Sequence, residues 1–240
     1  MLDGGGSPEY TDYNIGDSEV VPYLNAKGIS KLDCIILSHY DKDHAQGVIS
    51  AIRNLKVDNI IMPDYIDSGI YKETIKKEAK LRNIDITYIN KTQRHKLAEN
   101  LYAKFIYTDK QQQADNSNDA SLVTHLTYGN VKMLFTGDIT RRIEAELSDI
   151  NCDILKIPHH GSKTSTSEYL LSKTTPIYSV FCVGANNPYG HPVPGVLERC
   201  KKYESEIIRT DECGDVHFFI DTNRIHNVSS FNKMALKKKR

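Results

Sequence analysis

The chain has 240 residues, in which 31 Lys and Arg balance 31 Asp and Glu, so its formal net charge is zero at pH 7. Hydrophobic residues make up 39% and charged residues 26%, which is ordinary for a globular protein and excludes a disordered chain, a collagen or a disulfide-dense miniprotein. No apolar run approaches the roughly 20 residues that a membrane helix needs, no signal peptide opens the sequence, and zero net charge argues against a coat protein for nucleic acid.

Apolar runs alternate with amphipathic stretches along the chain. Runs rich in Ile, Val, Phe and Tyr predict strands, and apolar residues at helical spacing predict helices. The predicted strands are 33–37, 57–62, 84–89, 101–107, 122–128, 131–136, 153–157, 177–183 and 215–220. The predicted helices are 44–54, 70–82, 140–148, 166–172 and 194–203. This alternation indicates an α/β layered sheet.

Turn residues and composition predict the connections. Gly129-Asn130, between two predicted strands, indicates a hairpin, and the polar stretch 108–119 indicates a surface loop. The five cysteines include no CxxC pair, which predicts free, buried thiols and no disulfide framework. Because no linker divides the chain, we expect one domain over residues 1–230, followed by a basic tail at 231–240.

Four predicted strands each end in residues that bind metal ions or anions. In an open α/β sheet, ligands bind beyond the carboxyl ends of the strands, so we expect the four endings to converge on one site. The endings are SHYDKDH (38–44), TGD (136–138), PHHGS (158–162) and GANNPYGHP (184–192).

The first ending is the most informative. His39 and Asp41 can project to the same side, as alternate residues do, while Asp43 and His44 fall where the chain turns into a helix. Two pairs of ligands from one short loop suit two adjacent ions, and a mixed oxygen and nitrogen donor set favours Zn²⁺ or Mn²⁺. The alternative is that Asp41 or Asp43 only caps the helix. An isolated HxD motif would favour that alternative, whereas HxDxDH at a strand-to-helix junction favours metal binding.

The other endings complete the predicted site. We expect the Asp138 carboxylate to bridge both ions. The alternative is that Asp138 caps the predicted helix 140–148. His159 and His160 cannot both aim the same way if their strand continues, so we expect one to bind metal and the other to face substrate. His191 is a candidate last ligand.

A phosphate pocket is predicted next to the paired histidines. Gly161-Ser162 are expected to open a helix whose free N–H groups favour an anion. Ser162, Lys163 and Thr164 add donors there, so they are the predicted substrate-phosphate residues. His125 and His217 lie within predicted strands and are expected to be packed or solvated.

These motifs together resemble the metallo-beta-lactamase superfamily over nearly the whole chain. The superfamily's Asp-Gly motif is matched by Asp3-Gly4-Gly5, and its HxHxDH signature by residues 39–44, with Asp41 in place of the middle His. That replacement, together with PHHGSKTS (158–165) and NNPYGHP (186–192), is similar to the C-terminal nuclease domain of the ComEC competence proteins.

The resemblance implies a fold, a site and a reaction. The fold is a four-layer αββα sandwich, here lacking or truncated in the first β-hairpin because the sequence starts at the Asp-Gly motif. The reaction is cleavage of phosphodiester bonds in DNA, with single strands the expected substrate and DNA uptake the context, by a dinuclear site with a bridging hydroxide. The implied metal ligands are His39, Asp41, Asp43, His44, Asp138, His160 and His191, and the expected catalytic residues are Asp43, His159 and His160.

Two other functions fit the same residues. One is a small-molecule hydrolase, either a phosphocholine-type esterase or a lactamase-like enzyme, since fold alone does not choose the substrate. The other is a non-catalytic DNA-binding module whose metal fixes its loops. The absence of a signal peptide predicts a cytoplasmic protein. If the domain belongs to a larger ComEC-like protein, we expect it to be membrane-associated.

Overall fold

The computed structural model describes residues 1–7 and 11–231, so the predicted basic tail lies outside the described residues from 232 onward. The chain folds as two compact units. The first unit comprises residues 1–91 and 109–122, and the second comprises 92–108 and 123–240. No helix in the described ranges is both long and apolar enough to cross a bilayer.

The first unit is built on a parallel sheet with helices against it. Three strands pair in the order β2-β4-β5, and two short strands, β1 and β3, pair separately, also in parallel. The strands are β1 (Lys31–Leu32), β2 (Ile35–Ile36), β3 (Lys56–Val57), β4 (Asn59–Pro63) and β5 (Asp85–Ile89). The helices are η1 (Gly16–Val20), α1 (Val21–Ala26), α2 (Lys42–Asn54), α3 (Ile70–Leu81) and α4 (Asp109–Gln112).

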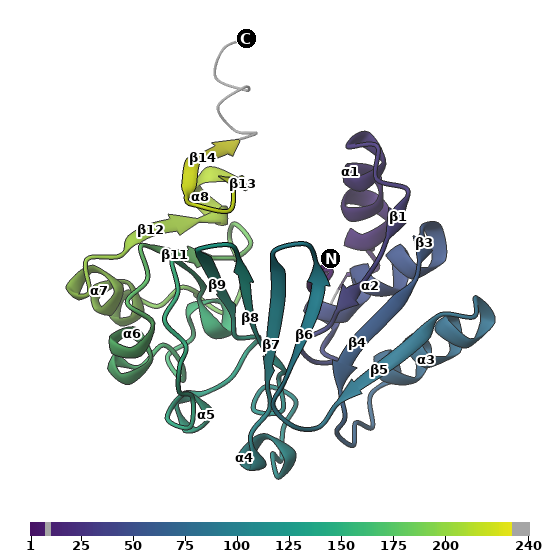
Figure 1. Cartoon of the computed structure of the whole chain (residues 1–240), viewed down its shortest axis with the longest axis horizontal. Helices are drawn as coiled ribbons and strands as arrows, with labels where there is room; N and C mark the ends of the chain where they lie inside the picture. The colour runs from purple at the N-terminus through teal and green to yellow at the C-terminus, as the bar shows by residue number, and fades with distance from the viewer. Residues whose placement is uncertain (8–10, 232–240) are drawn as a thin grey trace. The chain divides into compact units, whose positions relative to one another are not determined.

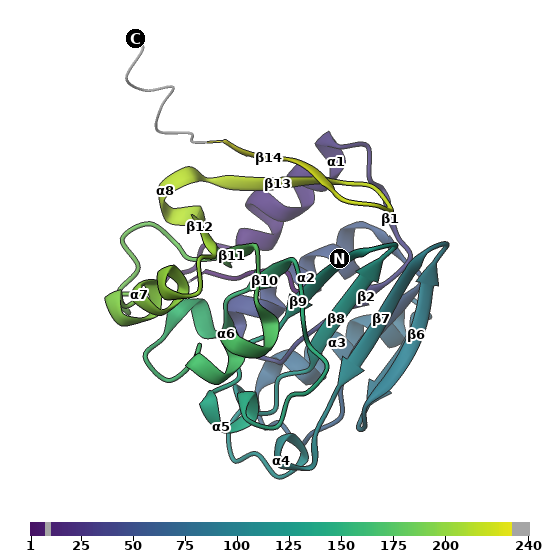
Figure 2. The same cartoon turned by 60° about the vertical axis from the view of Figure 1, so that its left-hand side comes forward.

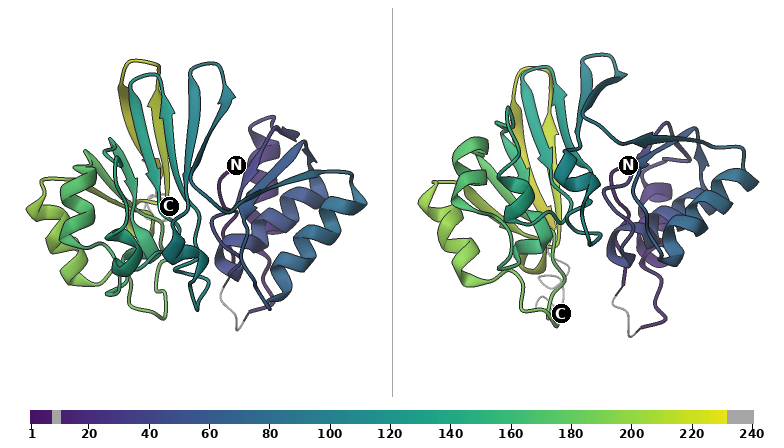
Figure 3. Two further views of the ribbon diagram at one scale, coloured as in Figure 1. Left: turned by 60° about the horizontal axis from the view of Figure 1, so that its bottom comes forward. Right: turned by 90° about the horizontal axis from the view of Figure 1, so that it is seen from below.

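The core of the first unit lies between its sheet and the neighbouring helices α2 and α3 (Figure 3). Val48 and Ile52, one helical turn apart on α2, are fully buried with Ile60 of β4 and Ile75 of α3. Because β2 and β4 are parallel, the segments that follow them leave the sheet at the same edge. The segment after β2 is the predicted ligand segment 37–44.

The second unit is built on a seven-stranded mixed sheet, seen in Figure 2, in the order β12-β11-β10-β9-β8-β7-β6. Strands β12 to β9 are parallel, and β9 to β6 are antiparallel. The strands are β6 (Gln93–Ala98), β7 (Leu101–Ile106), β8 (Val123–Tyr128), β9 (Val131–Phe135), β10 (Ile154–Lys156), β11 (Tyr178–Phe181) and β12 (Glu206–Arg209), with a separate hairpin of β13 (Asp215–Ile220) and β14 (Ile225–Phe231).

Helices α5 (Arg141–Glu144), α6 (Glu168–Thr174) and α7 (Pro194–Lys202) cover the parallel half of this sheet (Figure 1), and α8 (Thr210–Cys213) follows β12. Ile143, Leu170 and Val196 of the three helices are fully buried in one cluster with Leu155 of β10 and Phe181 of β11. The predicted α/β class is therefore confirmed in both units.

Several predicted elements match closely, and others do not. The hairpin at Gly129-Asn130 is confirmed, since Tyr128 pairs with Val131. The predicted helix 140–148 is wrong beyond Glu144, because only residues 141–144 are helical. The predicted loop 108–119 contains α4, whose Gln111 is fully buried and donates from Nε2 to the Ser121 carbonyl oxygen. All five cysteines are free, but Cys182 is exposed where burial was predicted.

The N-terminal segment lies directly against α2. The Gly4 N–H donates to the His44 carbonyl oxygen (2.8 Å), and the Gly47 N–H donates to the Gly5 carbonyl oxygen (3.0 Å). A Cβ at Gly47 would lie 1.9 Å from the Gly4 carbonyl oxygen, so no residue larger than glycine fits without moving the backbone. This close approach fixes the position of Asp3, the residue before Gly4.

Gly47→Ala should therefore destabilise the protein, although Gly→Ala inside a helix usually stabilises it. We expect a loss of about 1–3 kcal/mol from overpacking, measured by thermal and urea unfolding followed by circular dichroism. Gly195→Ala in α7 is the matched control, because its Cβ would meet only Arg199 at an ordinary 3.7 Å. Equal stability of the two variants would contradict the prediction.

A second prediction concerns His125, which is 7% exposed in β8. Burial lowers the pKa of His125 to about 4, although the Asn151 carbonyl oxygen, 3.1 Å from Nε2, accepts its N–H. The ordinary His pKa is about 6.5, so between pH 6.5 and 4 the unfolded chain binds a proton that the folded chain does not. This contribution to stability is complete above about pH 6.5 and is lost as the pH falls toward 4.

Urea unfolding at pH 7 and at pH 4.5 measures the effect. The free energy of unfolding should fall on acidification by up to about 3 kcal/mol more in the native protein than in His125→Gln, which has no titrating imidazole there. His217→Gln, in the separate β13–β14 hairpin, serves as the control for removal of a strand histidine. An identical pH dependence in the native protein and His125→Gln would refute the prediction.

Candidate metal centre

The carboxylate of Asp3 organises the histidines of the first unit. Its Oδ1 accepts the Ser38 N–H (2.7 Å), and its Oδ2 accepts the Ser38 hydroxyl (2.8 Å) and the Nδ1–H of His44 (2.9 Å). An ionised carboxylate only accepts, so Nδ1 of His44 carries the proton and Nε2 presents a lone pair. The Ser38 oxygen in turn accepts from Nδ1 of His39 (2.9 Å), which gives His39 the same tautomer.

The charge state of Asp3 agrees with this acceptor role. Burial opposes its ionisation, but the attraction of His44 and the hydrogen bonds from His44 and Ser38 outweigh burial and hold the pKa of Asp3 below its ordinary value. A carboxylate that accepts the Nδ1–H of an imidazole is the usual partner that orients a metal-binding histidine.

The predicted ligands of the first unit lie around these imidazoles. Nε2 of the fully buried His39 is 3.7 Å from Oδ2 of Asp41, and Nε2 of His44 is 4.0 Å from Oδ2 of Asp43. Asp41 is the N-cap residue of α2, but its side chain makes no capping hydrogen bond. The capping alternative therefore does not account for the Asp41 carboxylate.

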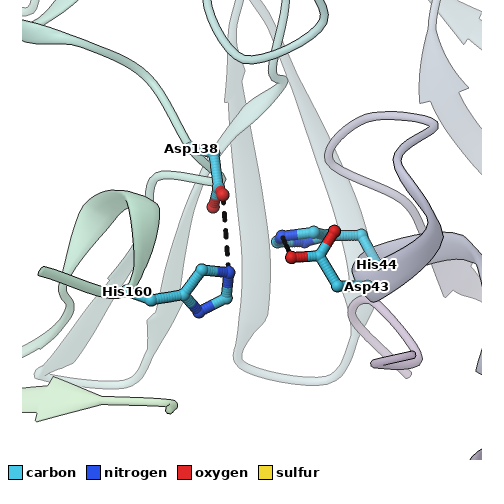
Figure 4. A group of neighbouring side chains, drawn as sticks. All are labelled: Asp43, His44, Asp138 and His160. Atoms are coloured by element: carbon cyan, nitrogen blue, oxygen red, sulfur yellow. Dashed lines mark ion pairs between the residues drawn. The ribbon is translucent and has the colours of Figure 1, made fainter. Parts of the chain in front are cut away.

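In the second unit, the predicted ligands gather around Asp138, which follows the end of β9 and is buried. Its Oδ2 lies 3.4 Å from Nε2 of His160 and 4.0 Å from Nε2 of His159, and its Oδ1 lies 3.3 Å from Nζ of Lys156. Figure 4 shows His160 and Asp138 facing each other, and Asp43 beside His44. The alternative role of Asp138 as a helix cap is wrong, because Thr140 is the N-cap of α5.

The backbone turns both paired histidines toward Asp138. Strand β10 ends at Lys156, and a single 3₁₀ turn, η2 (Pro158–Gly161), follows with His159 and His160 at φ of 49° and 54°. The strand does not continue, so the alternation expected for adjacent residues does not apply. Left-handed backbone at non-glycine residues costs on the order of 1–3 kcal/mol each and clusters at functional sites.

His160 has a fixed tautomer like that of His44. Its Nδ1 lies 2.6 Å from the Cys182 carbonyl oxygen, which can only accept, so Nδ1 carries a proton and, in the neutral imidazole, the lone pair of Nε2 faces Asp138. His159 differs, because its Nδ1 lies 3.4 Å from the hydroxyl of Thr164. Of the two histidines, His160 has the geometry of a metal ligand.

His191 is held through its backbone. Oδ1 of Asn187 accepts the His191 N–H (3.0 Å), and Nδ2 of Asn187 donates to the His191 carbonyl oxygen (2.7 Å). Burial, then the nearby His159 and His160, lower the pKa of His191, which favours the neutral imidazole that binds metal. Nδ1 of His191 is buried and has no hydrogen-bond partner among the described residues.

The predicted phosphate residues do not open a helix, so that part of the prediction is wrong. Ser162 ends the η2 turn in an extended conformation, and α6 begins only at Glu168, capped by Ser167. Gly161 ends the turn at φ +86°, packed so tightly against Pro192 and Phe181 that a Cβ would lie 2.6 Å from Pro192. Residues 161–164 therefore offer no free N–H groups of a helix N-terminus to an anion.

The three side chains nevertheless lie beside the histidines. The hydroxyls of Ser162 and Thr164 are 3.1 Å apart, Thr164 contacts His159, and Lys163 is exposed. Their proposed role therefore depends on two hydroxyls and one ammonium group and not on a helix dipole.

Three residues with roles in these groups were not predicted as site residues. Asp3 was noted only as part of a motif, and Ser38 and Lys156 were not singled out. Lys156 had a visible signal, since it is a charged residue inside the apolar run 153–157. Its Nζ contacts the Gly137 carbonyl oxygen (3.1 Å) as well as Asp138.

The donor set fits a divalent cation. Asp43 and His44 of the first unit, and Asp138 and His160 of the second, each offer a carboxylate oxygen or an imidazole nitrogen suited to a metal ion (Figure 4). Imidazoles whose Nδ1 is already hydrogen-bonded, together with carboxylate oxygens, are characteristic of Zn²⁺ and other divalent metal sites. The buried and unpartnered Nδ1 of His191 is a further atom that a cation would satisfy.

Comparisons with known proteins agree with this picture. The family model described as the metallo-beta-lactamase superfamily matches residues 1–184. The chain is 26% identical to ComE operon protein 3 of Bacillus subtilis over 91% of its length, and 26% identical to the competence protein ComA of Neisseria gonorrhoeae over 83%. The predicted resemblance to the competence proteins is confirmed. The chain spans only 30% and 27% of these two relatives.

A solved structure shares the fold. CmlA, a diiron β-hydroxylase from Streptomyces venezuelae, superposes with a TM-score of 0.54 over 75% of this chain and 44% of its own, at 11% sequence identity. The predicted fold class is confirmed.

Asp3→Asn should weaken metal binding, because an amide at this position removes the charge that fixes the His44 tautomer. We expect a 10- to 100-fold loss of Zn²⁺ affinity, measured by competition with a chromophoric chelator. The ¹⁵N NMR shifts of the His44 ring should report the altered tautomer in the metal-free protein. Asp33→Asn, an exposed aspartate of the same unit, is the control. Equal affinities in the two variants would rule out the orienting role of Asp3.

Proposed function

The chain belongs to the metallo-beta-lactamase superfamily, and from this we propose that it is a metal-dependent hydrolase that cleaves phosphodiester bonds in DNA. The observation that carries the proposal is the shared tautomer of His39, His44 and His160, each with its Nδ1–H donated to the protein and Nε2 left to bind a cation. Similarity to competence proteins supports DNA as the substrate and DNA uptake as the context.

In this proposal the chain is one hydrolase domain that uses two divalent ions, Zn²⁺ or Mn²⁺. The residues that would hold these ions are His39, Asp41, Asp43, His44, Asp138, His160 and His191. When bound, the ions would supply Lewis acidity, which lowers the pKa of water and neutralises charge on phosphoryl oxygens.

The residues around this site would position the substrate and move protons. Lys163 and the hydroxyls of Ser162 and Thr164 would donate hydrogen bonds to a phosphate. His159, whose Nδ1 contacts the Thr164 hydroxyl and whose Nε2 is farther from Asp138 than that of His160, would protonate the leaving oxygen as a general acid. Lys156 would hold Asp138 through the ammonium–carboxylate contact that the structure shows.

Asp138→Asn should remove nearly all cleavage while leaving the fold intact. We expect kcat on a single-stranded oligodeoxynucleotide with Mn²⁺ or Zn²⁺ to fall by at least about 100-fold, as for loss of a group acting in the transition state. Asp215→Asn, an exposed aspartate of the same unit, is the control and should keep full activity.

The assay includes double-stranded DNA, RNA and bis-p-nitrophenyl phosphate, and metal content is measured on the purified protein. Cleavage of the chromogenic diester without cleavage of DNA would identify a small-molecule hydrolase instead. Oligonucleotide binding without turnover would identify a DNA-binding module. A preparation that binds no divalent metal would refute the proposal.

A further inference from the structure

One face of the second unit's sheet carries three cations in neighbouring strands. Arg94 of β6 pairs directly with Lys104 of β7, and Lys104 pairs with His125 of β8. One step along, Tyr102 of β7 pairs with Thr127 of β8, which pairs with Lys132 of β9. Because side chains two residues apart lie on the same face, all of these side chains share one face.

The cations are not neutralised by the surrounding protein. Like charges directly opposite each other in a sheet are destabilising, yet Arg94 faces Lys104 across the strand pair. Nζ of Lys104 approaches the Ser148 carbonyl oxygen (3.4 Å), and Nζ of Lys132 approaches Oδ1 of Asn151 (3.3 Å). Neither these lysines nor Arg94 forms an ion pair with any residue in the part of the chain that the structure describes.

These side chains line a cavity of about 290 Å³, near the lower end of the range for small-ligand sites. Its lining is Arg94, Tyr102, Ala103, Lys104, His125, Thr127, Lys132, Asp149 and Asn151, and we name it the Arg94 pocket. Asp149 is its one carboxylate, so the lining keeps a net positive charge. Tyr102 is 48% exposed, which leaves its ring open to a ligand.

The electrostatics of His125 agree with a positive pocket. Its pKa is lowered first by burial, and Lys104, Lys132 and Arg94 lower it further. A neutral His125 adds no charge, so the attraction for an anion comes from the three cations.

The Arg94 pocket is separate from the metal-binding residues of its own unit. Lys132 lies near the start of β9, whereas Asp138 follows the carboxyl end of the same strand. No residue of the pocket is among the predicted metal ligands or phosphate residues.

We propose that the Arg94 pocket binds a phosphate of single-stranded nucleic acid, with an adjacent base stacked on Tyr102. Cations beside an open aromatic ring are the usual elements of single-strand recognition, since unpaired bases expose their faces while the cations follow the backbone. A duplex hides those faces. The inference does not rest on the proposed cleavage reaction, because binding is measurable without turnover.

The test is fluorescence anisotropy with a labelled 15-nucleotide oligo-dT in EDTA, so that no metal supports cleavage. Arg94→Gln combined with Lys132→Gln should weaken binding at least tenfold and lower the slope of log K against log salt by about 0.7, the value for one lost phosphate contact on a single strand. Tyr102→Leu should weaken binding roughly 5- to 100-fold by loss of stacking.

The control pair is Lys173→Gln with Lys201→Gln, two exposed lysines of α6 and α7. Circular dichroism spectra and melting curves verify that every variant folds. The proposal is supported if the control pair binds within twofold of the native protein while the pocket variants lose affinity. It is overturned if the pocket variants bind normally or if the control pair loses as much affinity.

Three further ligands separate the sources of phosphate. Unlabelled dTMP and an oligo-dT·oligo-dA duplex should compete much more weakly than oligo-dT. Vesicles containing phosphatidylglycerol should bind the native protein and the pocket variants alike. Equal competition by dTMP or by the duplex, or a loss confined to vesicle binding, would overturn the assignment to single strands.

Discussion

The hydrogen-bonded carboxylate of Asp3 is the interaction on which the geometry of the first unit's predicted metal ligands depends. The Asp3 side chain accepts hydrogen bonds from the Ser38 N–H, the Ser38 hydroxyl and the His44 imidazole. The Ser38 hydroxyl in turn orients the imidazole of His39. Asp3 is itself held because its N–H donates to the Ile36 carbonyl oxygen and the next residue bonds to α2. The ligand geometry is thus set by the way the N-terminal segment packs between β2 and α2.

The second unit reaches the same tautomer with a neutral acceptor. The Cys182 carbonyl oxygen accepts the Nδ1–H of His160, and the side-chain amide of Asn187 fixes the His191 backbone. Lys156 instead brings a charge to Asp138. The ammonium group of Lys156 would repel a cation bound at Asp138, so Lys156 should lower the affinity of this unit for a metal ion.

Much of this arrangement could be predicted from the sequence. Periodicity located α2, α3 and α7 and most sheet strands, because these elements bury one face in a core. Strands β1, β6, β12 and β14 were missed. Polar residues such as Arg94 and Lys96 interrupt the apolar pattern of β6, polar residues likewise interrupt β14, and β1 and β12 are only two and four residues long. Chemistry-bearing motifs located the candidate ligands. The resemblance implied His160 as a ligand, but the geometry that orients it could not be predicted, because it depends on left-handed backbone and on a carbonyl oxygen distant in sequence.

The interleaving of the two units has a consequence for how the polypeptide acquires its structure. The Leu122 N–H donates to the carbonyl oxygen of Ser38, and the buried Gln111 donates to the Ser121 carbonyl oxygen. In sequence, β6 and β7 of the second unit separate residues 109–122 from the first 91 residues. A nascent chain that ends before residue 122 therefore lacks the Leu122–Ser38 hydrogen bond that holds the segment 37–44. Such long-range closure is slow compared with helix formation, so the Ser38 segment should become ordered late in synthesis, after strands of the other unit have emerged.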